Sequence, residues 1–196
     1  MADLLGGLAD ILKNRQDRFI LVTMAAGIKI QKINEMLGAK LPTIRIMPNT
    51  PVSVGEGMVL YSLCKAITEA EEQEFKQILK FGGKLDKSDE DLIDAGCVVS
   101  GCGPAFVYTF AESLQKAGVK CGLSEEKALL YAAQTLKGAA ELLLTSGETP
   151  DALRTKVCSP KGSTIEGVEV LLNSDFEKIV DETVKASFKR TKELGQ

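Results

Sequence analysis

Hydrophobic positions in the first 87 residues alternate between helical and strand-like spacing. Apolar residues recur at helical intervals from Leu4 to Lys13, and the same spacing predicts helices at 28–37 and 68–81. Thr68 and Glu71 form a capping box at the start of the latter, and Gly82-Gly83 is interpreted as its stop. Short apolar runs predict strands at 19–24, 43–47 and 57–62, the first two covered on both faces. The pattern predicts an α/β domain with a largely parallel sheet over residues 1–87.

From Ser88 to the C-terminus the pattern is helical throughout. Helices are predicted to begin at hydroxyl residues that suit the N-cap position: Ser88, Ser124, Thr149, Ser159 and Ser174. The helix from Ser124 to about Thr145 has apolar residues on nearly every side, and such a helix is normally buried all round. In a domain this small, a partner subunit must cover it. Residues 88–196 are therefore predicted to form an all-helical dimerisation domain, in a homodimer or higher homo-oligomer.

Composition narrows the class of protein further. Net charge is −3 over 196 residues, with no basic footprint for nucleic acid. No apolar run reaches bilayer-spanning length, so we expect no membrane partner. The N-terminus lacks the basic start and apolar run of a signal peptide. The five cysteines show no C-x-x-C spacing, which indicates reduced thiols and a cytoplasmic protein.

The chain contains no histidine, which removes many catalytic mechanisms. A Ser-His-Asp triad, a histidine general base and a histidine metal site are all excluded, and no metal site is predicted. If the protein is an enzyme, its chemistry must come from a cofactor, backbone dipoles or hydroxyl groups.

Three segments are candidates for binding chemistry. In the segment 158–164, Ser159 suits an N-cap and Pro160 the first helical position, while Gly162 lets a ligand approach the backbone. The helix start would then attract a small carboxylate, although a well-capped helix without a ligand explains the same residues. The other two segments, 25–27 and 48–51, follow predicted strands, where ligands of parallel sheets bind. Ordinary strand-to-helix turns are the alternative for both.

The nucleotide-binding signature is missing from this sequence. No G-x-G-x-x-G follows a strand, and Gly101-Cys102-Gly103 lies in the helical half, where it suits a hinge or a close helix contact. Three strands are few for an open sheet, and the chain starts on a helix. We therefore expect an N-terminal part of the domain to be absent.

Three motifs, taken together, resemble the pyrroline-5-carboxylate reductase family. They are Ile46-Met47-Pro48-Asn49-Thr50-Pro51 with Val54-Gly55-Glu56-Gly57-Met58, then Ser100-Gly101-Cys102-Gly103-Pro104-Ala105-Phe106, and Ser159-Pro160-Lys161-Gly162-Ser163-Thr164-Ile165. The resemblance covers the chain from about Asp3 to Leu194. It implies a Rossmann-like, doubly wound domain, here partial, followed by a helical domain that forms an interlocked dimer.

The resemblance also implies a reaction and a set of site residues. Members of the family reduce 1-pyrroline-5-carboxylate to L-proline with NADPH or NADH, the last step of proline biosynthesis. The cofactor's nicotinamide end is expected near Met24, Ala25, Ala26, Asn49, Thr50 and Pro51. The substrate carboxylate is expected at Ser159, Gly162, Ser163 and Thr164. The Thr164 hydroxyl is the expected catalytic group, bonded to the ring nitrogen.

Two residues and the front of the chain depart from the family pattern. The family usually has a second glycine where Lys161 stands, and often a tyrosine where Phe106 stands. The resemblance implies that the family's opening strand and glycine-rich turn are absent here, and that Met1 falls near the helix after the fourth strand of the nucleotide domain. Three hypotheses remain open: a shortened reductase, a non-catalytic dimerisation module of the same family, and a related imine or hydroxy-acid reductase. The 159–164 motif argues against the third.

Overall fold

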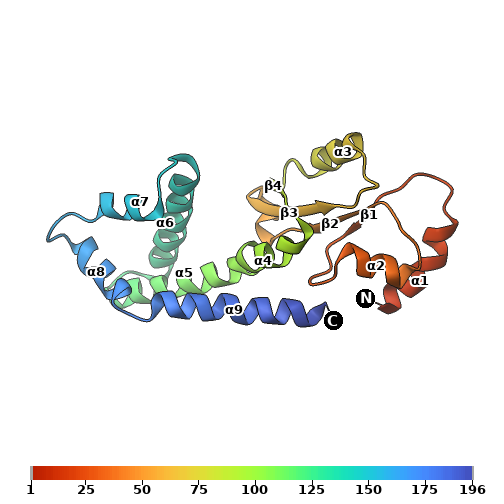
Figure 1. Cartoon of the computed structure of the whole chain (residues 1–196). Coiled ribbons are helices and arrows are strands. Elements are labelled where there is room, and N and C mark those ends of the chain that lie inside the picture. The colour runs from red at the N-terminus through yellow and green to blue at the C-terminus, as the bar shows by residue number, and fades with distance from the viewer. Residues whose placement is uncertain (1, 196) are drawn as a thin grey trace. The chain divides into compact units, whose positions relative to one another are not determined.

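A computed structural model describes residues 2–195, with the side chains of residues 2–4 and 13 left undescribed. The chain forms two compact units (Figure 1). Residues up to Pro104, together with those from Val184 onward, make the first unit, and Ala105–Thr183 make the second. This division differs from the expected change at 87/88, because the first helix of the helical half packs on the sheet.

The first unit contains a four-stranded mixed sheet in the order β1-β2-β3-β4. Its strands are β1 (Leu21–Thr23), β2 (Thr43–Met47), β3 (Gly57–Leu63) and β4 (Gly83–Lys87). β1 pairs parallel with β2 and β3 parallel with β4, but β2 and β3 are antiparallel. The predicted largely parallel sheet is therefore wrong in its middle pairing. The connection between β2 and β3 is the short 3-10 helix η1 (Thr50–Val54), which is too short for a parallel crossover.

The fourth strand was missed because Gly82-Gly83 was interpreted only as a helix stop. Gly83 has φ +123°, and a Cβ there would overlap the backbone of Gly57 on β3. Gly57 and Gly83 thus allow β3 and β4 to approach closely, and no pattern of neighbouring residues in the sequence indicates this contact.

The first strand is shorter and more exposed than predicted. It covers residues 21–23 rather than 19–24, and Val22 is 46% exposed. Within the described residues β1 is an outer strand of the sheet. The exposure of Val22 shows that β1 is not buried on both faces, contrary to the prediction.

Helices cover both faces of the sheet. α3 (Glu69–Leu79) lies over one face and α4 (Glu90–Ser100) over the other. The α3 side buries Ile44, Ile46, Val59, Tyr61 and Phe75, and the α4 side buries Met47, Leu60, Ile93 and Cys97. α1 (Ala2–Asn14) and α2 (Ile30–Leu37) share a further cluster that includes Leu5, Ile33 and Leu37.

Of the six predicted helix starts, three are confirmed and two are corrected, while the sixth, Ser174, lies two residues before Phe176, where the last helix begins, and accepts from the Phe176 N–H. The capping box of Thr68 and Glu71 is present, and Ser124 and Thr149 accept backbone N–H bonds at the starts of their helices. α4 takes Asp89, not Ser88, as its N-cap. The Ser159 helix does not exist as predicted, because that helix begins at Ser163 with Gly162 as its N-cap.

The remaining helices are α5 (Gly103–Lys120), α6 (Glu125–Thr145), α7 (Pro150–Val157), α8 (Ser163–Leu172) and α9 (Phe176–Leu194). In the single chain α6 buries only Ala128 and Ala132, while Leu130 and Leu144 are 60% and 61% exposed. The apolar faces of this unit have no covering partner among the residues that the structure describes.

One stretch bears on the expectation that no segment spans a membrane. By length and composition alone, residues 90–120 could cross a bilayer, with mean hydropathy 1.3 and 22% of the apolar window buried. Small residues and few charges raise its hydropathy without an unbroken apolar run. A turn at residues 101–102 divides the stretch into α4 and α5, and α4 packs on the sheet.

Candidate functional site

The two strand-end loops predicted to bind the cofactor lie at one edge of the sheet. Residues 24–27 follow β1 and residues 48–51 follow β2, and because these strands are parallel neighbours their carboxyl ends meet there. Met24 is 64% exposed, Ala25 and Ala26 are half-buried, and Thr50 is exposed. The small side chains leave the backbone of the first loop open to a flat ring.

Asn49 contributes to this edge in a way that its predicted role did not include. Its Nδ2 donates to the carbonyl oxygen of Ser100 at 2.9 Å, and its Oδ1 accepts from the backbone N–H of Met58 at 2.9 Å. The side chain therefore fastens the loop after β2 to α4 and β3. The amide is committed to the protein's own backbone, so we assign it a structural role in the loop.

The loop after β1 rests on the end of α9. Gly27 has φ +73°, and a Cβ there would collide with the carbonyl oxygen of Thr191 and crowd the amide nitrogen of Gly195. A Cβ at Gly195 would in turn overlap the Gly27 carbonyl. Only glycine suits this mutual backbone contact.

A network of charged residues joins β2, α4 and α9 close to these loops. Arg45 on β2 is fully buried, and its Nη2 donates to Asp94 Oδ1 on α4 at 2.6 Å. Asp94 Oδ2 accepts from Lys192 Nζ on α9 at 3.1 Å. Glu90 lies 3.8 Å from Arg45 Nη1, beyond hydrogen-bond range. Arg45 Nε and Nη1 have no hydrogen-bond partner in the described part of the chain.

The charges of this network govern the ionisation of Asp94. Burial raises the pKa of its carboxyl, but hydrogen bonds from Lys192 and Arg45 outweigh burial, and the pKa lies below its ordinary value. Asp94 is therefore an anion between two cations at neutral pH. Sequence reasoning missed this network, although a single arginine inside the buried strand 43–47 was a usable signal.

The predicted substrate clamp lies in the second unit. Ser159, Pro160, Lys161 and Gly162 form a turn in which the Gly162 N–H donates to the Ser159 carbonyl at 2.9 Å. Gly162 then caps α8 without any side-chain hydrogen bond to the first N–H groups. Ser159, Ser163 and Thr164 are exposed. The expected open helix start is thus present, but it is displaced by three residues and Ser159 belongs to the turn.

Lys161 adopts the left-handed conformation in this turn, with φ +61°. Among the described residues it is the one non-glycine position with positive φ. Proline followed by a residue with positive φ is the pattern of a type II turn, which favours glycine at that second position. The positive φ at this position explains why the family pattern has a glycine where Lys161 stands.

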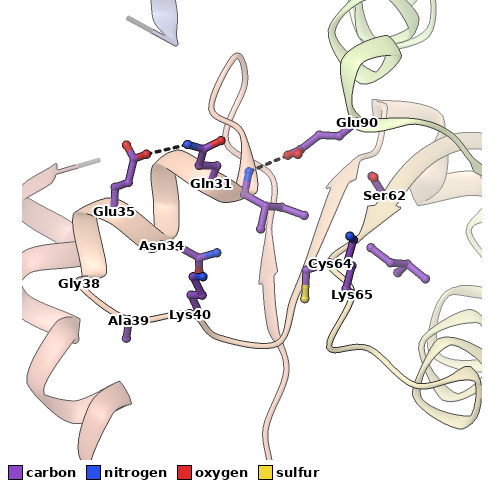
Figure 2. Close-up of a pocket in the computed structure, with 12 residues that line it drawn as sticks. Gln31, Asn34, Glu35, Gly38, Ala39, Lys40, Ser62, Cys64, Lys65 and Glu90 are labelled. Carbon is purple, nitrogen blue, oxygen red and sulfur yellow. Dashed lines mark hydrogen bonds between the residues drawn. The ribbon is translucent and has the colours of Figure 1, made fainter.

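A further cavity lies within the first unit. It measures about 750 Å³, and its walls are α2, the turn at Gly38–Lys40 and Glu90 of α4. Figure 2 shows Ser62, Cys64 and Lys65 of the chain around the end of β3 on its opposite side. This is the sheet edge opposite the ends of β1 and β2, since β3 is antiparallel to β2. None of the residues proposed for cofactor or substrate lines it.

Comparisons with known proteins address the family directly. A family model for pyrroline-5-carboxylate reductase dimerisation matches residues 90–194. Pyrroline-5-carboxylate reductase 3 of Danio rerio is 40% identical over 96% of this chain and 65% of its own length. The pyrroline-5-carboxylate reductase of Aquifex aeolicus is 35% identical over 94% of this chain and 70% of its own. The chain thus spans less than two thirds of the Danio rerio protein.

A solved structure is similar over the entire chain. The pyrroline carboxylate reductase of Plasmodium falciparum, solved with NADP bound, matches with a TM-score of 0.91 and 32% identity over 100% of this chain and 77% of that one. The fold is therefore that of a partial Rossmann-like domain followed by a helical dimerisation domain. The chain belongs to the pyrroline-5-carboxylate reductase family.

Proposed function

We propose that this chain reduces 1-pyrroline-5-carboxylate to L-proline with NADPH or NADH, the last step of proline biosynthesis. The observation that carries the proposal is the start of α8. It lies inside the family-matched region, lacks a side-chain cap and displays the Ser163 and Thr164 hydroxyls. Unpaired N–H groups and the positive end of the helix dipole attract a carboxylate such as that of the substrate.

Each residue of the α8 start has a separate part in the proposed reaction. The N–H groups of residues 163 and 164 bind the carboxylate, with Gly162 giving access to the backbone. The Thr164 hydroxyl bonds the ring nitrogen and fixes the orientation of the imine. No protein acid is required, because the proton on the ring nitrogen comes from water or is already present in the substrate's iminium form, which agrees with a chain that lacks histidine.

The residues at the sheet edge fit the nicotinamide end of the cofactor. When bound, NADPH supplies the hydride. Met24, Ala25 and Ala26 would flank the ring, with Thr50 and Pro51 on the neighbouring loop, because Met24 and Thr50 are exposed and the two alanines are small. Asn49 would act by holding its loop in place. The sequence contains no G-x-G-x-x-G, so the fit extends to the nicotinamide end only. The NADP in the Plasmodium falciparum relative supports this choice of cofactor.

We also propose a homodimer or higher homo-oligomer in the cytoplasm, with no nucleic-acid or membrane partner. The exposed apolar side chains of α6 and the family's dimerisation domain support self-association. The five free cysteines suit a reducing compartment.

The test measures NADPH oxidation on addition of 1-pyrroline-5-carboxylate, together with binding of L-proline by calorimetry. We expect slow turnover at high NADPH concentration and saturable proline binding. In the variant Thr164→Ala, KM for the substrate should rise, whereas the matched variant Thr155→Ala, an exposed threonine of α7, should behave as the parent.

Two other outcomes would contradict the proposal in different ways. Proline binding without turnover would favour the non-catalytic dimerisation module. Absence of both, or an unchanged KM in Thr164→Ala, would remove the α8 start from the site.

A further inference from the structure

The end of α9 contacts the proposed nicotinamide loop and a buried carboxylate at the same place. Gly195 and Thr191 meet the backbone of Gly27, and Lys192, which lies between them in the sequence, bonds Asp94. Gly27, Asp94, Lys192 and Gly195 also line one cavity of about 420 Å³. The backbone contact and the ion pair are therefore neighbours in space.

Asp94 links this contact to the second loop of the sheet edge. Through Arg45 it holds β2 two residues before that strand ends and the loop 48–51 begins. Its helix, α4, continues to Ser100, whose carbonyl accepts from Asn49 in that loop. Asp94 is thus linked to both strand-end loops: to loop 24–27 through Lys192 on α9, and to loop 48–51 through Arg45 and through α4.

Asp94 is the counter-ion of the buried Arg45, which makes its place in this connection specific. Arg45 is fully buried, and Asp94 is the one carboxylate within hydrogen-bond distance of it in the described residues. Lys192 is 45% exposed, and its Nζ is held by the Asp94 carboxylate and by the Phe188 ring of α9, whose centroid lies 5.1 Å away. A flexible lysine held in this way fixes the last turn of α9, and with it the surface on which Gly27 rests.

We propose that Lys192 and Asp94 are positioning residues for the cofactor: they hold the end of α9 against Gly27 and so set the nicotinamide-facing loop 24–27. The inference rests on the proposed function for the identity of the ligand. The mechanical part, the support of loop 24–27 by α9, stands on contacts alone.

Two variants test the link by different physical means. Lys192→Met keeps most of the unbranched side chain and removes its charged end, leaving the Arg45–Asp94 pair intact. Gly195→Ala adds a Cβ against the Gly27 carbonyl and changes no charge. The matched control is Lys87→Met, a lysine of similar exposure whose Nζ bonds the buried Glu72 at 2.7 Å on the α3 face of the sheet.

The first readout is amide hydrogen exchange in peptides that cover residues 24–28. Exchange should become faster in Lys192→Met and Gly195→Ala and stay at the parental rate in Lys87→Met. Unchanged exchange in both test variants would overturn the inference, whatever the activity of the protein.

The second readout is NADPH binding in solution, with the separate Michaelis constants where turnover is measured. We expect the NADPH dissociation constant to rise about fivefold in Lys192→Met, which corresponds to ~1 kcal/mol. KM for the substrate should not change. A general loss of stability would instead lower kcat through the folded fraction and leave both constants unaltered.

The two readouts separate failure of this inference from failure of the proposed function. Faster exchange with an unchanged NADPH constant would overturn the positioning role. A parent chain that does not bind NADPH at all would overturn the proposed cofactor, and the exchange result would still decide whether α9 supports the loop.

Discussion

At the scale of single residues, Lys161 is the clearest case of a side chain in an unfavourable backbone position. It occupies the left-handed region at φ +61°, directly before the glycine that caps α8. Residues with a Cβ lose roughly 1–2 kcal/mol there relative to the right-handed region. The turn tolerates this cost because its other residues, Pro160 and Gly162, suit their positions.

Lys161→Gly should therefore stabilise the chain. We expect the free energy of unfolding to rise by about 0.5–1 kcal/mol, since relief of the left-handed strain exceeds glycine's entropy cost in the unfolded state. Urea unfolding followed by circular dichroism measures the change. Lys189→Gly, at an exposed position inside α9, is the control and should lower stability by about 1 kcal/mol. A lower stability in Lys161→Gly would contradict the conformational argument.

At the scale of secondary-structure elements, side chains that join one element to another decide the geometry of the sheet edge. Asn49 connects the start of η1 to β3 and α4, and Glu72 connects α3 to the sheet. Glu72 accepts from the Tyr61 hydroxyl of β3 at 2.8 Å and from Lys87 of β4 at 2.7 Å. The sequence indicates neither link: Asn49 is expected there only as a cofactor residue, and Glu72 is one of several glutamates in its helix.

Asn49→Ala should reduce stability even without any ligand. The substitution leaves the Met58 N–H and the Ser100 carbonyl without their partner, which costs about 1–3 kcal/mol for a group that stays unsatisfied. The free energy of unfolding in urea measures this loss. Ser53→Ala removes only an exposed bond to the Thr50 carbonyl and should change stability by less than about 0.5 kcal/mol. Parental stability in Asn49→Ala would return this residue to a purely ligand-binding role.

The α3 carboxylates make stability depend on acid. The hydrogen bond from Lys87 lowers the pKa of Glu72 to about 2 against the opposing effect of burial, with further bonds from Lys76 and Tyr61. The Arg18 bond likewise lowers the pKa of Glu71 to about 2. Because both folded-state values lie below the ordinary 4.5, their contribution is complete above that pH and is lost as pH falls toward about 2.

Glu72→Gln should therefore flatten the loss of stability between about pH 4.5 and pH 2, and lower stability at neutral pH. Melting temperature measured across this range tests the expectation. Glu74→Gln, an exposed carboxylate of the same helix, is the control and should keep the parental slope. An equal slope in Glu72→Gln and the parent would show that Glu72 does not carry the acid sensitivity.

At the scale of the whole molecule, the second unit displays apolar surface that a single chain does not cover. Exposed large apolar side chains occur on α5, α6, α7, α8 and α9, among them Tyr108, Leu130, Leu144, Val157, Val170 and Ile179. Extended apolar surface of this kind marks an interface. The matched dimerisation domain, residues 90–194, supports a second copy of the chain as its partner.

Leu130→Glu should weaken self-association, since it places a charge on an apolar face of α6. Light scattering at micromolar concentration should show a dimer or larger species for the parent and a shift toward monomer for the variant. Lys189→Glu, which adds negative charge on exposed α9 surface, should leave the mass unchanged. A parent that is already monomeric at this concentration would contradict the proposed dimer.

The sequence by itself determined the features that depend on neighbouring residues. The caps of Thr68, Ser124 and Thr149 set helix starts through hydrogen bonds within three residues. The helical period and the three motifs likewise depend only on residues that are close in the sequence. These signals were sufficient for the two-part fold and for the family, which the comparisons confirm.

Only the tertiary structure decided the features that depend on contacts between distant segments. The fourth strand requires Gly57 and Gly83 to meet across the sheet. Arg45 and Asn49 each have a partner about fifty positions away, Asp94 and the Ser100 carbonyl, and Gly27 contacts the end of α9. The N-cap of α8 is Gly162 and not the predicted Ser159, because Lys161 adopts a left-handed conformation in the preceding turn, which its residue type does not indicate.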